Sequence, residues 1–288
     1  MLGVQMGHGT ETSPREPGEG GRAVRALVLA AGWGTRLAAL ARGRPKALLP
    51  LGRRTCLDVV VDRLDAVPQL VALDVLTNDA FAPAFHAWAG ERQTRAPLRI
   101  HSDGTRRLEE RLGAVGDLAH YLERVQPRES LLVMGGDNAC DFDLAPFARL
   151  GARAPAVAVH DLGDPALVSL YASVELTAGG RVRALVEKDP APPTTRAALA
   201  IYALPAGQLG LVPRYLAEGG SPDNLGSLAE WLVARGLLHG LELTGTWVDI
   251  GTPAEYARAR RLFGARGRRA GAASGAARLQ ARGPERTP

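Results

Sequence analysis

Four short apolar runs recur along the chain, and each one ends in glycine or polar residues. They cover residues 23–31 (AVRALVLAA), 70–77 (LVALDVLT), 130–137 (SLLVMGGD) and 154–161 (APAVAVHD). Runs of this length, with little alternation of polar positions, are typical of strands that a parallel sheet buries on both faces. We therefore predict four buried strands at these positions.

Stretches with helical periodicity separate these runs. One begins at Cys56 (CLDVVVDRLDAV) and another at Arg111 (RLGAVGDLAHYLERV). Strands and helices that alternate at this spacing predict βαβ units with right-handed crossovers. The predicted fold class is therefore α/β, with a mostly parallel twisted sheet sandwiched by helices.

The second half of the chain has a different pattern. Two alternating segments flank Gly179–Gly180, which predicts a small β-hairpin. Further on, the sequence predicts a helix over 228–238, one late strand over 241–251 and a closing helix over 252–263. Thr252 is suited to cap the closing helix, and Pro253 to occupy its first position.

The ends of the chain differ from the part between them. We predict a disordered extension over residues 1–22, one domain over 23–263 and a disordered basic tail over 264–288. The N-terminal segment lacks the apolar core of a secretory signal, and no apolar run reaches the roughly 20 residues that span a bilayer. A membrane partner is therefore not expected.

The basic charge of the chain is concentrated at its end. The net charge is +5, yet residues 258–288 alone contain nine arginines and one acid, so the rest is slightly acidic. Nucleic acid is therefore not an expected partner. The cysteines Cys56 and Cys140 are isolated from one another in sequence, which fits a reducing cytoplasm and argues against a disulfide framework or a zinc cluster.

The first apolar run leads directly into the glycine-rich segment Gly32-Trp33-Gly34-Thr35-Arg36-Leu37. A dinucleotide-binding fingerprint would have glycine in place of Leu37, and no GK[ST] follows, so neither motif is complete. A glycine-rich loop at the carboxyl end of a strand can still hold phosphate oxygens with its backbone amides. Arg36 would add a guanidinium that binds two phosphate oxygens at once.

Lysine occurs at only two positions among the 35 basic residues of the chain, Lys46 and Lys188. An ammonium is a compact point charge that approaches one phosphate oxygen, whereas a guanidinium is a broader fork. We therefore treat both lysines as candidate phosphate ligands.

Four segments, in order, resemble the sugar-phosphate nucleotidylyltransferase family, which includes NDP-sugar pyrophosphorylases such as the glucose-1-phosphate thymidylyl- and uridylyltransferases. They are the glycine-rich loop with Lys46 ten residues after its arginine, VMGGDN (133–138), VEKDP (186–190) and TWVDIGTPAEY (246–256). The resemblance implies the Rossmann-like nucleotidyltransferase fold, with a nucleotide-binding half to about residue 140 and a sugar-phosphate-binding half after it. It also implies Mg²⁺-dependent transfer of a nucleotidyl group from a nucleoside triphosphate to a sugar 1-phosphate, with release of pyrophosphate.

The same resemblance implies the site residues. Arg36, Lys46, Asp137 and Lys188 would be catalytic, with Lys46 near the reacting α-phosphate and Lys188 at the phosphate of the sugar phosphate. Mg²⁺ would be held by Asp137 and Asp249. The nucleotide would contact Ala31, Gly32, Gly34, Thr35, Arg36, Lys46, Gly104 and Asp137, and the sugar phosphate would contact Glu187, Lys188, Tyr202 and Asn224.

The sequence departs from the family pattern in two places. The base-reading glutamine that usually precedes the segment corresponding to residues 101–122 is missing, and Ala200 stands where glycine is usual. The base and the acceptor therefore stay open. Asp141 and Asp143 also lie near Asp137 in sequence; we expect Asp143 to cap the helix that follows it.

Two other functions are kept as alternatives. The first is a cytidylyltransferase that acts on a phosphorylated polyol, inositol or amino alcohol, and the second is a catalytically silent regulatory relative. Members of the family are often homo-oligomers, but no segment of this sequence indicates an interface.

Overall fold

The computed structural model describes residues 23–264, so the predictions for residues 1–22 and for the tail from residue 265 onward lie outside the described residues. Within this part, no helix is both long and apolar enough to cross a membrane. Both cysteines are buried free thiols.

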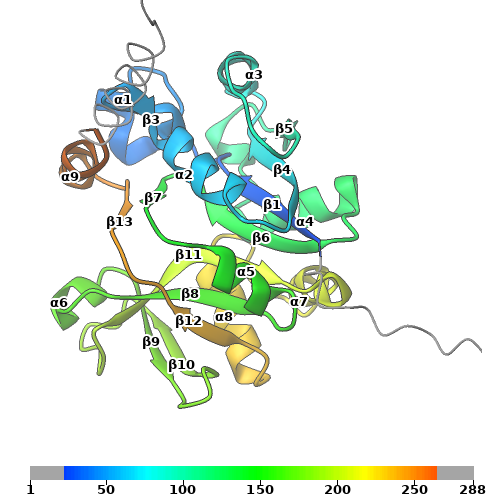
Figure 1. The fold of residues 1–288 in the computed structure, drawn as a ribbon, viewed down its shortest axis with the longest axis vertical. Coiled ribbons are helices and arrows are strands. Elements are labelled where there is room, and N and C mark those ends of the chain that lie inside the picture. The colour runs from blue at the N-terminus through cyan, green and yellow to red at the C-terminus, as the bar shows by residue number, and fades with distance from the viewer. Residues whose placement is uncertain (1–22, 265–288) are drawn as a thin grey trace, which may run out of the picture.

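Four parallel strands form the first half of the main sheet. Three of them are apolar runs predicted above (23–31, 70–77 and 130–137), whereas the run over 154–161 lies in the second half, where it pairs antiparallel with residues 196–204. The four strands lie in the order β6 (Ser130–Gly135), β1 (Val24–Leu29), β4 (Leu70–Thr77), β5 (Leu98–Ser102). The helices that connect them are α2 (Cys56–Asp65), α3 (Ala82–Gly90) and α4 (Ala114–Val125). The carboxyl ends of β1 and β6 therefore meet at one edge of the sheet (Figure 1).

The second half of the sheet is built around β11 (Arg196–Leu204). This strand pairs antiparallel with β6, with β8 (Ala156–Asp161) and with β9 (Ala172–Leu176). The predicted hairpin is confirmed, since β9 pairs antiparallel with β10 (Val182–Glu187). The sheet is completed by β12 (His239–Glu242), which runs parallel to β8. The α/β prediction is confirmed, and the antiparallel pairs lie in the half that was predicted to carry the hairpin.

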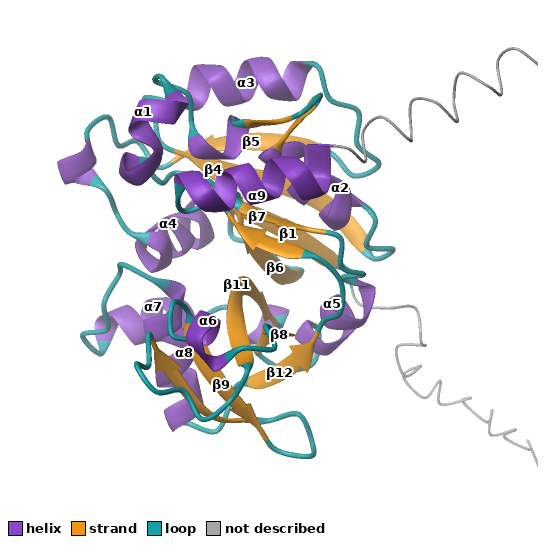
Figure 2. Ribbon diagram, turned by 90° about the vertical axis from the view of Figure 1, so that its left-hand side faces the viewer, coloured by secondary structure: helices purple, strands orange, loops and turns teal. Residues whose placement is uncertain are grey.

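Helices cover both faces of the sheet (Figure 2). One face packs on α2, α5 (Ala145–Gly151) and α9 (Pro253–Gly264), and the opposite face packs on α4, α7 (Leu211–Ala217) and α8 (Leu225–Ala234). Successive residues of β1 divide between the two cores: Ala26 and Val28 belong to the first, and Leu27 to the second. Because both faces are buried, the strand is apolar except at Arg25, whose guanidinium pairs with Asp74 and Glu129.

Short elements complete the described part of the chain. They are α1 (Ala38–Ala41), α6 (Pro165–Val168), β2 (Pro50–Leu51), β3 (Arg54–Thr55) and the 3₁₀ turns η1 (Thr35–Leu37), η2 (Lys46–Leu48), η3 (Leu108–Glu110) and η4 (Ala206–Gln208). The start of α9 is as predicted, because Thr252 Oγ1 accepts a hydrogen bond from the Glu255 amide at 3.3 Å.

The prediction of one late strand over 241–251 is wrong. The segment forms the end of β12 and then a separate strand, β13 (Trp247–Asp249), which pairs antiparallel with β7 (Asn138–Cys140) in a small second sheet. The chain turns between them at Gly245, whose φ is 136°, and the Thr246 amide donates to Asp141 Oδ1 at 2.7 Å. This turn brings the end of the chain back to the end of β6.

Candidate active site

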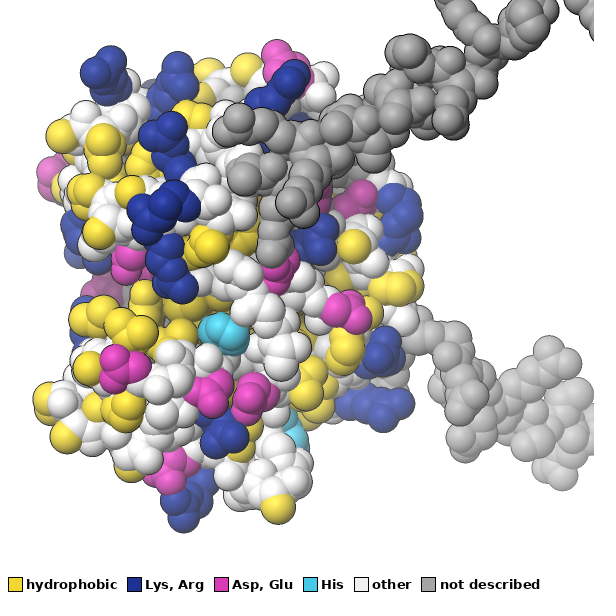
Figure 3. Space-filling model, turned by 60° about the vertical axis from the view of Figure 1, so that its left-hand side comes forward, with side chains coloured by type: hydrophobic (Ala, Val, Ile, Leu, Met, Phe, Trp, Pro, Cys, Tyr) yellow, Lys and Arg dark blue, Asp and Glu magenta, His cyan; other side chains and the backbone are white. Residues whose placement is uncertain are grey.

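A cavity of about 530 Å³ opens where β1 and β6 end. Its size suits a small-molecule ligand. Figure 3 shows a hollow between the upper and lower parts of the molecule on this side, with hydrophobic side chains in it and Lys and Arg side chains above it. The lining includes six residues of the predicted nucleotide set, namely Ala31, Gly32, Gly34, Thr35, Lys46 and Asp137.

The glycine-rich loop has the geometry of an anion cradle. The backbone amides of Gly32, Trp33 and Gly34 donate no hydrogen bond to another described residue. Gly34 has a φ of 62°, and a Cβ on it would lie 3.3 Å from the Cβ of Lys46. Glycine is therefore required both for the left-handed backbone and for the close approach of Lys46 to the loop.

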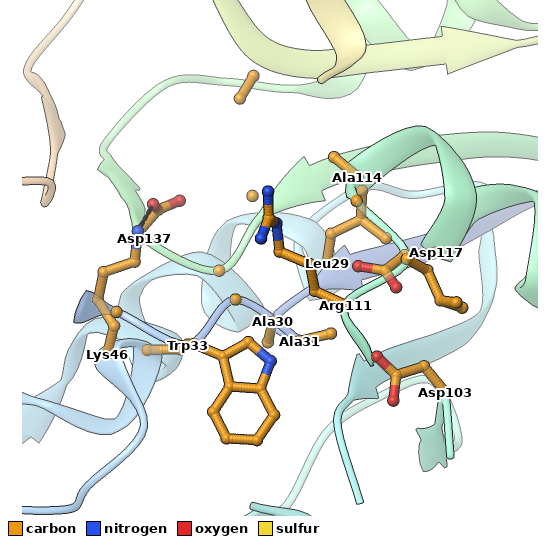
Figure 4. Close-up of a pocket in the computed structure, with 18 of the residues that line it drawn as sticks. Leu29, Ala30, Ala31, Trp33, Lys46, Asp103, Arg111, Ala114, Asp117 and Asp137 are labelled. Atoms are coloured by element: carbon orange, nitrogen blue, oxygen red, sulfur yellow. Dashed lines mark hydrogen bonds and ion pairs between the residues drawn. The ribbon is translucent and has the colours of Figure 1, made fainter. Parts of the chain in front are cut away.

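Lys46 and Asp137 form an ion pair at this end of the cavity (Figure 4). Burial would lower the pKa of Lys46, but the charge of Asp137 more than offsets it, so the pKa is raised. Burial would likewise raise the pKa of Asp137, and the ammonium of Lys46 lowers it instead. Both side chains are therefore charged at neutral pH.

A second interaction fixes the orientation of Asp137. Asn138 Nδ2 donates to Asp137 Oδ1 at 2.8 Å, and the indole Nε1 of Trp247 donates to Asn138 Oδ1 at 3.0 Å. Asn138 is only 2% exposed, so the three residues form a buried chain from β13 to the carboxylate.

Asp249 lies beside Asp137, although the two are far apart in sequence. In the β7–β13 pair Asp249 is opposite Asn138, and the Ile250 amide donates to the Asp137 carbonyl at 3.0 Å. Burial and then the charge of Asp137 raise the pKa of Asp249 to about 7. Two buried carboxylates that repel one another are a suitable donor set for a hard divalent cation, which binds oxygen ligands. Among residues 23–264 there is no cluster of three or more potential protein ligands, but Mg²⁺ often takes only one or two carboxylates and completes its shell with phosphates and water.

A smaller cavity of about 260 Å³ adjoins the first, and the two share Ala114, Ala200 and Leu225 as wall residues. Its lining includes Glu187, Tyr202, Asn224 and Asp249 from the predicted set. Tyr171 and Trp247 also line it, with ring centroids 5.0 Å apart. Asp137 in the larger cavity and Asp249 in the smaller one therefore stand at the junction between the two.

Three predicted residues lie outside the linings of these two cavities. Arg36 is exposed, and its guanidinium would come within 3.3 Å of a Cβ on Gly251. Lys188 is exposed too, with a φ of 50° and its amide bonded to the Tyr171 carbonyl at 2.8 Å. Gly104 follows Asp103 but does not itself line a cavity wall. The roles of these three residues stay predictions.

The two other acids near Asp137 have structural partners. Asp143 Oδ1 accepts from the Ala145 amide at 2.9 Å just before α5, but the N-cap position is Leu144, so the expectation that Asp143 caps this helix is wrong. Asp141 accepts the Thr246 amide bond described above. Neither acid lines the two cavities.

The end of the larger cavity that lies away from Lys46 was not predicted. Trp33, Asp103, Arg111 and Asp117 line it, and Figure 4 shows the carboxyl groups of Asp103 and Asp117 side by side there. A signal for Asp117 was available: it is four residues before the buried Tyr121 and therefore on the apolar face of α4, where an unpaired acid is rare. No comparable signal marks Asp103.

These two acids share one buried environment. Asp103 Oδ1 accepts from the Thr105 amide at 2.7 Å and from its hydroxyl at 2.8 Å. Burial, followed by the charge of Asp103 and a hydrogen bond with it, raises the pKa of Asp117 to about 7. The pKa of Asp103 is raised as well, mainly by burial. The hydrogen bonds from Thr105 and the nearby His120 lower this pKa, but by less than burial raises it.

This raised pKa predicts a pH-dependent effect of Asp117→Asn on stability. An unfolded aspartate titrates near 3.8 and Asp117 in the folded protein near 7, so the folded protein holds more protons between these values and loses stability as pH rises through them. Asparagine cannot ionise and removes that loss. Without nucleotide, the variant should melt at least about 2 °C above the wild type at pH 8, and the difference should be clearly smaller at pH 5, where the folded carboxyl still holds its proton.

The control for this measurement is Glu123→Gln, an exposed position on the same helix. Its melting temperature should follow the wild type at both pH values. A melting difference for Asp117→Asn that is the same at pH 5 and pH 8 would contradict the assignment of a raised pKa to this carboxyl.

Comparison with known proteins shows the family to which the chain belongs. A family model described as nucleotidyl transferase matches residues 25–264. The mannose-1-phosphate guanyltransferase beta-A of Xenopus laevis is 25% identical over 240 residues, which are 81% of this chain. The N-acetylmuramate alpha-1-phosphate uridylyltransferase of Caulobacter vibrioides is 28% identical over 254 residues, 79% of this chain and 92% of its own length.

The match to the first relative is partial, since the chain spans only 62% of the length of the Xenopus laevis protein. A crystal structure named for a glucose-1-phosphate thymidylyltransferase from Bacillus anthracis superposes with a TM-score of 0.69 at 21% identity, over 84% of this chain and 96% of that one. At this identity the superposition shows a shared fold.

Proposed function

Because the chain belongs to the nucleotidyl transferase family, we propose that it transfers a nucleotidyl group from a nucleoside triphosphate to a sugar 1-phosphate and releases pyrophosphate. The observation that supports this most is the junction of the two cavities, where Lys46, Asp137 and Asp249 converge. A reaction between two anions needs positive charge at the point where the two substrates meet. Lys46 supplies one such charge, and the paired carboxylates can hold a divalent cation that supplies another.

The larger cavity is the proposed triphosphate site. The free amides of Gly32, Trp33 and Gly34 would hold phosphate oxygens, and Lys46 would donate to the α-phosphate where negative charge increases during transfer. A phosphate oxygen of the acceptor is already a nucleophile. The residues therefore need only align it with the α-phosphorus and the leaving pyrophosphate, with no covalent enzyme intermediate.

A magnesium ion would be held by Asp137 and Asp249. Bound there, it would neutralise phosphate charge and act as a Lewis acid on the reacting phosphoryl group. The chain contributes the orientation of this pair, because Trp247 and Asn138 fix Asp137 while the β7–β13 pairing fixes Asp249.

The smaller cavity is the proposed acceptor site. Its aromatic pair, Tyr171 and Trp247, offers an apolar face, while Glu187 and Asn224 offer polar groups that can bond hydroxyls. This combination of one apolar wall and a few fixed polar groups suits a sugar ring. The names of the relatives support a sugar 1-phosphate as acceptor but differ in the base.

The test is pyrophosphate release from each common nucleoside triphosphate with Mg²⁺ and a panel of hexose, amino-sugar and polyol phosphates. We expect release with at least one sugar 1-phosphate, and loss of that release when EDTA removes the metal. Release only with CTP and a polyol or amino-alcohol phosphate would replace the proposal with a cytidylyltransferase. A complete lack of release with every pair would favour a catalytically silent relative.

A further inference from the structure

The larger cavity has two chemically different ends. Figure 4 shows the Lys46–Asp137 pair at one end and the carboxyl groups of Asp103 and Asp117 at the other, with the ring of Trp33 between them. If the first end receives the triphosphate, the second end lies where the base of the same nucleotide would reach. The inference that follows therefore rests on the proposed function, from which it takes the Lys46 end as the triphosphate site.

Asp117 is a buried acid without a complete set of partners. The residue is only 8% exposed, and its Oδ1 is buried without a hydrogen-bond partner among the described residues. A buried carboxyl oxygen in this state carries a desolvation cost. Asp117 also lines the cavity, so its carboxyl group stands at the wall against which a ligand would pack.

The neighbouring carboxyl determines what Asp117 can offer to a ligand. The carboxyl groups of Asp103 and Asp117 lie side by side, and Asp103 itself is held by the amide and hydroxyl of Thr105. When Asp117 carries a proton, the neighbouring carboxylate draws that proton toward itself. The Asp117 oxygen that faces away from Asp103 is therefore an acceptor in either protonation state, and the ligand must supply donors.

The common bases differ in this respect. Guanine presents two adjacent donors, N1–H and the 2-amino group, on its pairing edge. Adenine and cytosine place a ring-nitrogen acceptor beside their amino group, and uracil and thymine place carbonyl oxygens on both sides of N3–H. Each of these acceptors would face the oxygens of Asp117. Only guanine avoids that repulsion.

The aromatic wall of this end is consistent with a purine. Trp33 stands inside the glycine-rich loop and lines the cavity, and Phe81 supports its ring at a centroid distance of 5.6 Å. Leu108 and Leu112 contribute apolar surface to the same lining. A base that stacks on a tryptophan gains affinity whatever its identity, so the selection falls to the carboxyl group.

We propose that the nucleotide is a guanosine nucleotide and that Asp117, held in place by Asp103, is the residue that selects it. Its carboxyl group accepts hydrogen bonds from N1–H and the 2-amino group of the base, and Trp33 stacks on the ring. The usual glutamine is therefore replaced in this chain by an acid from the first turn of α4.

The test compares three triphosphates that differ only at C2 of the base, in calorimetric binding experiments with Mg²⁺ and without acceptor. Wild-type protein should bind GTP at least about tenfold more tightly than ITP, which lacks the 2-amino group, and more tightly than XTP, which carries an oxygen there. Asp117→Asn should weaken GTP binding by about tenfold or more. The same variant should bind XTP better than the wild type does, because its amide can donate to the C2 oxygen.

Two controls separate this effect from misfolding. Glu123→Gln, an outward position on the same helix, should leave all three affinities unchanged. Inorganic tripolyphosphate should bind Asp117→Asn as well as it binds the wild type, because its site lies at the Lys46 end.

Equal binding of GTP and ITP by the wild type, or tightest binding of UTP, CTP or ATP, would overturn the proposal for guanine. Unchanged GTP binding in Asp117→Asn would overturn the role of that residue. The expected binding pattern without pyrophosphate release from any acceptor would uphold this inference and refute the transferase activity. Pyrophosphate release from pyrimidine triphosphates without a preference for GTP would refute this inference and uphold the transferase activity.

Discussion

Replacing Asp137 with asparagine should reduce the rate of pyrophosphate release by about a thousandfold or more. Asparagine keeps the shape and the bond from Asn138 but removes the charge that pairs with Lys46 and repels Asp249. A neutral amide is a poor ligand for a hard divalent cation, so the variant should also bind Mn²⁺, measured by titration, far more weakly. Steady-state kinetics at saturating substrates give the rate.

The matched control is Asp143→Asn, six residues along the chain. Asp143 is exposed and accepts the Ala145 amide just before α5, and the side-chain oxygen of asparagine can accept the same bond. Its rate should stay within about twofold of the wild type. If Asp137→Asn keeps more than about a tenth of wild-type activity, the paired-carboxylate site is not where transfer occurs.

The second large effect is expected for Lys46→Arg, which keeps the positive charge and should still lower turnover by about a hundredfold. The side chain of Lys46 is 20% exposed and lies between the glycine-rich loop and Asp137. Its ammonium pairs with Asp137 at the cavity wall, and a broader guanidinium there would shift Asp137 or the phosphate that Lys46 contacts. The measurement is single-turnover kinetics with the preferred triphosphate and acceptor.

Arg44→Lys is the reverse exchange two residues earlier, at an exposed position, and serves as the control. It should have no measurable effect on turnover. A near-normal rate for Lys46→Arg would show that the position needs only a charge, and the steric argument for lysine would then fail.

The stability prediction for Asp117→Asn and the two large kinetic effects concern opposite ends of one cavity. Asp117 carries a cost in the protein without nucleotide, because its carboxyl is buried beside another acid. Sites that bind ligands commonly hold such unfavourable groups, and their removal often stabilises the protein while it lowers function. A stabilised Asp117→Asn with poor GTP binding would show this trade-off directly.

Much of the fold and of the phosphate end of the site could be predicted from the sequence. Continuous apolar runs are required of strands buried on both faces, so β1, β4, β6 and β8 were recognisable from composition alone. The glycine-rich loop was recognisable because it follows the first apolar run, and Lys46 because it is one of only two lysines in the chain. These features depend on neighbours in the chain, and local sequence determines them.

The rest depended on contacts between distant segments. The family resemblance implied that Asp137 and Asp249 share a cation, but the strand pairing that places them side by side follows from the turn at Gly245, which the predicted single strand over 241–251 did not include. Asp103 and Asp117 meet because β5 and α4 come together at one end of the cavity, and nothing in either segment alone indicates the partner. The sequence by itself determined which residues can carry charge to a phosphate. Only the tertiary structure decided which carboxyl groups face one another, because burial and mutual repulsion arise from packing and not from spacing along the chain.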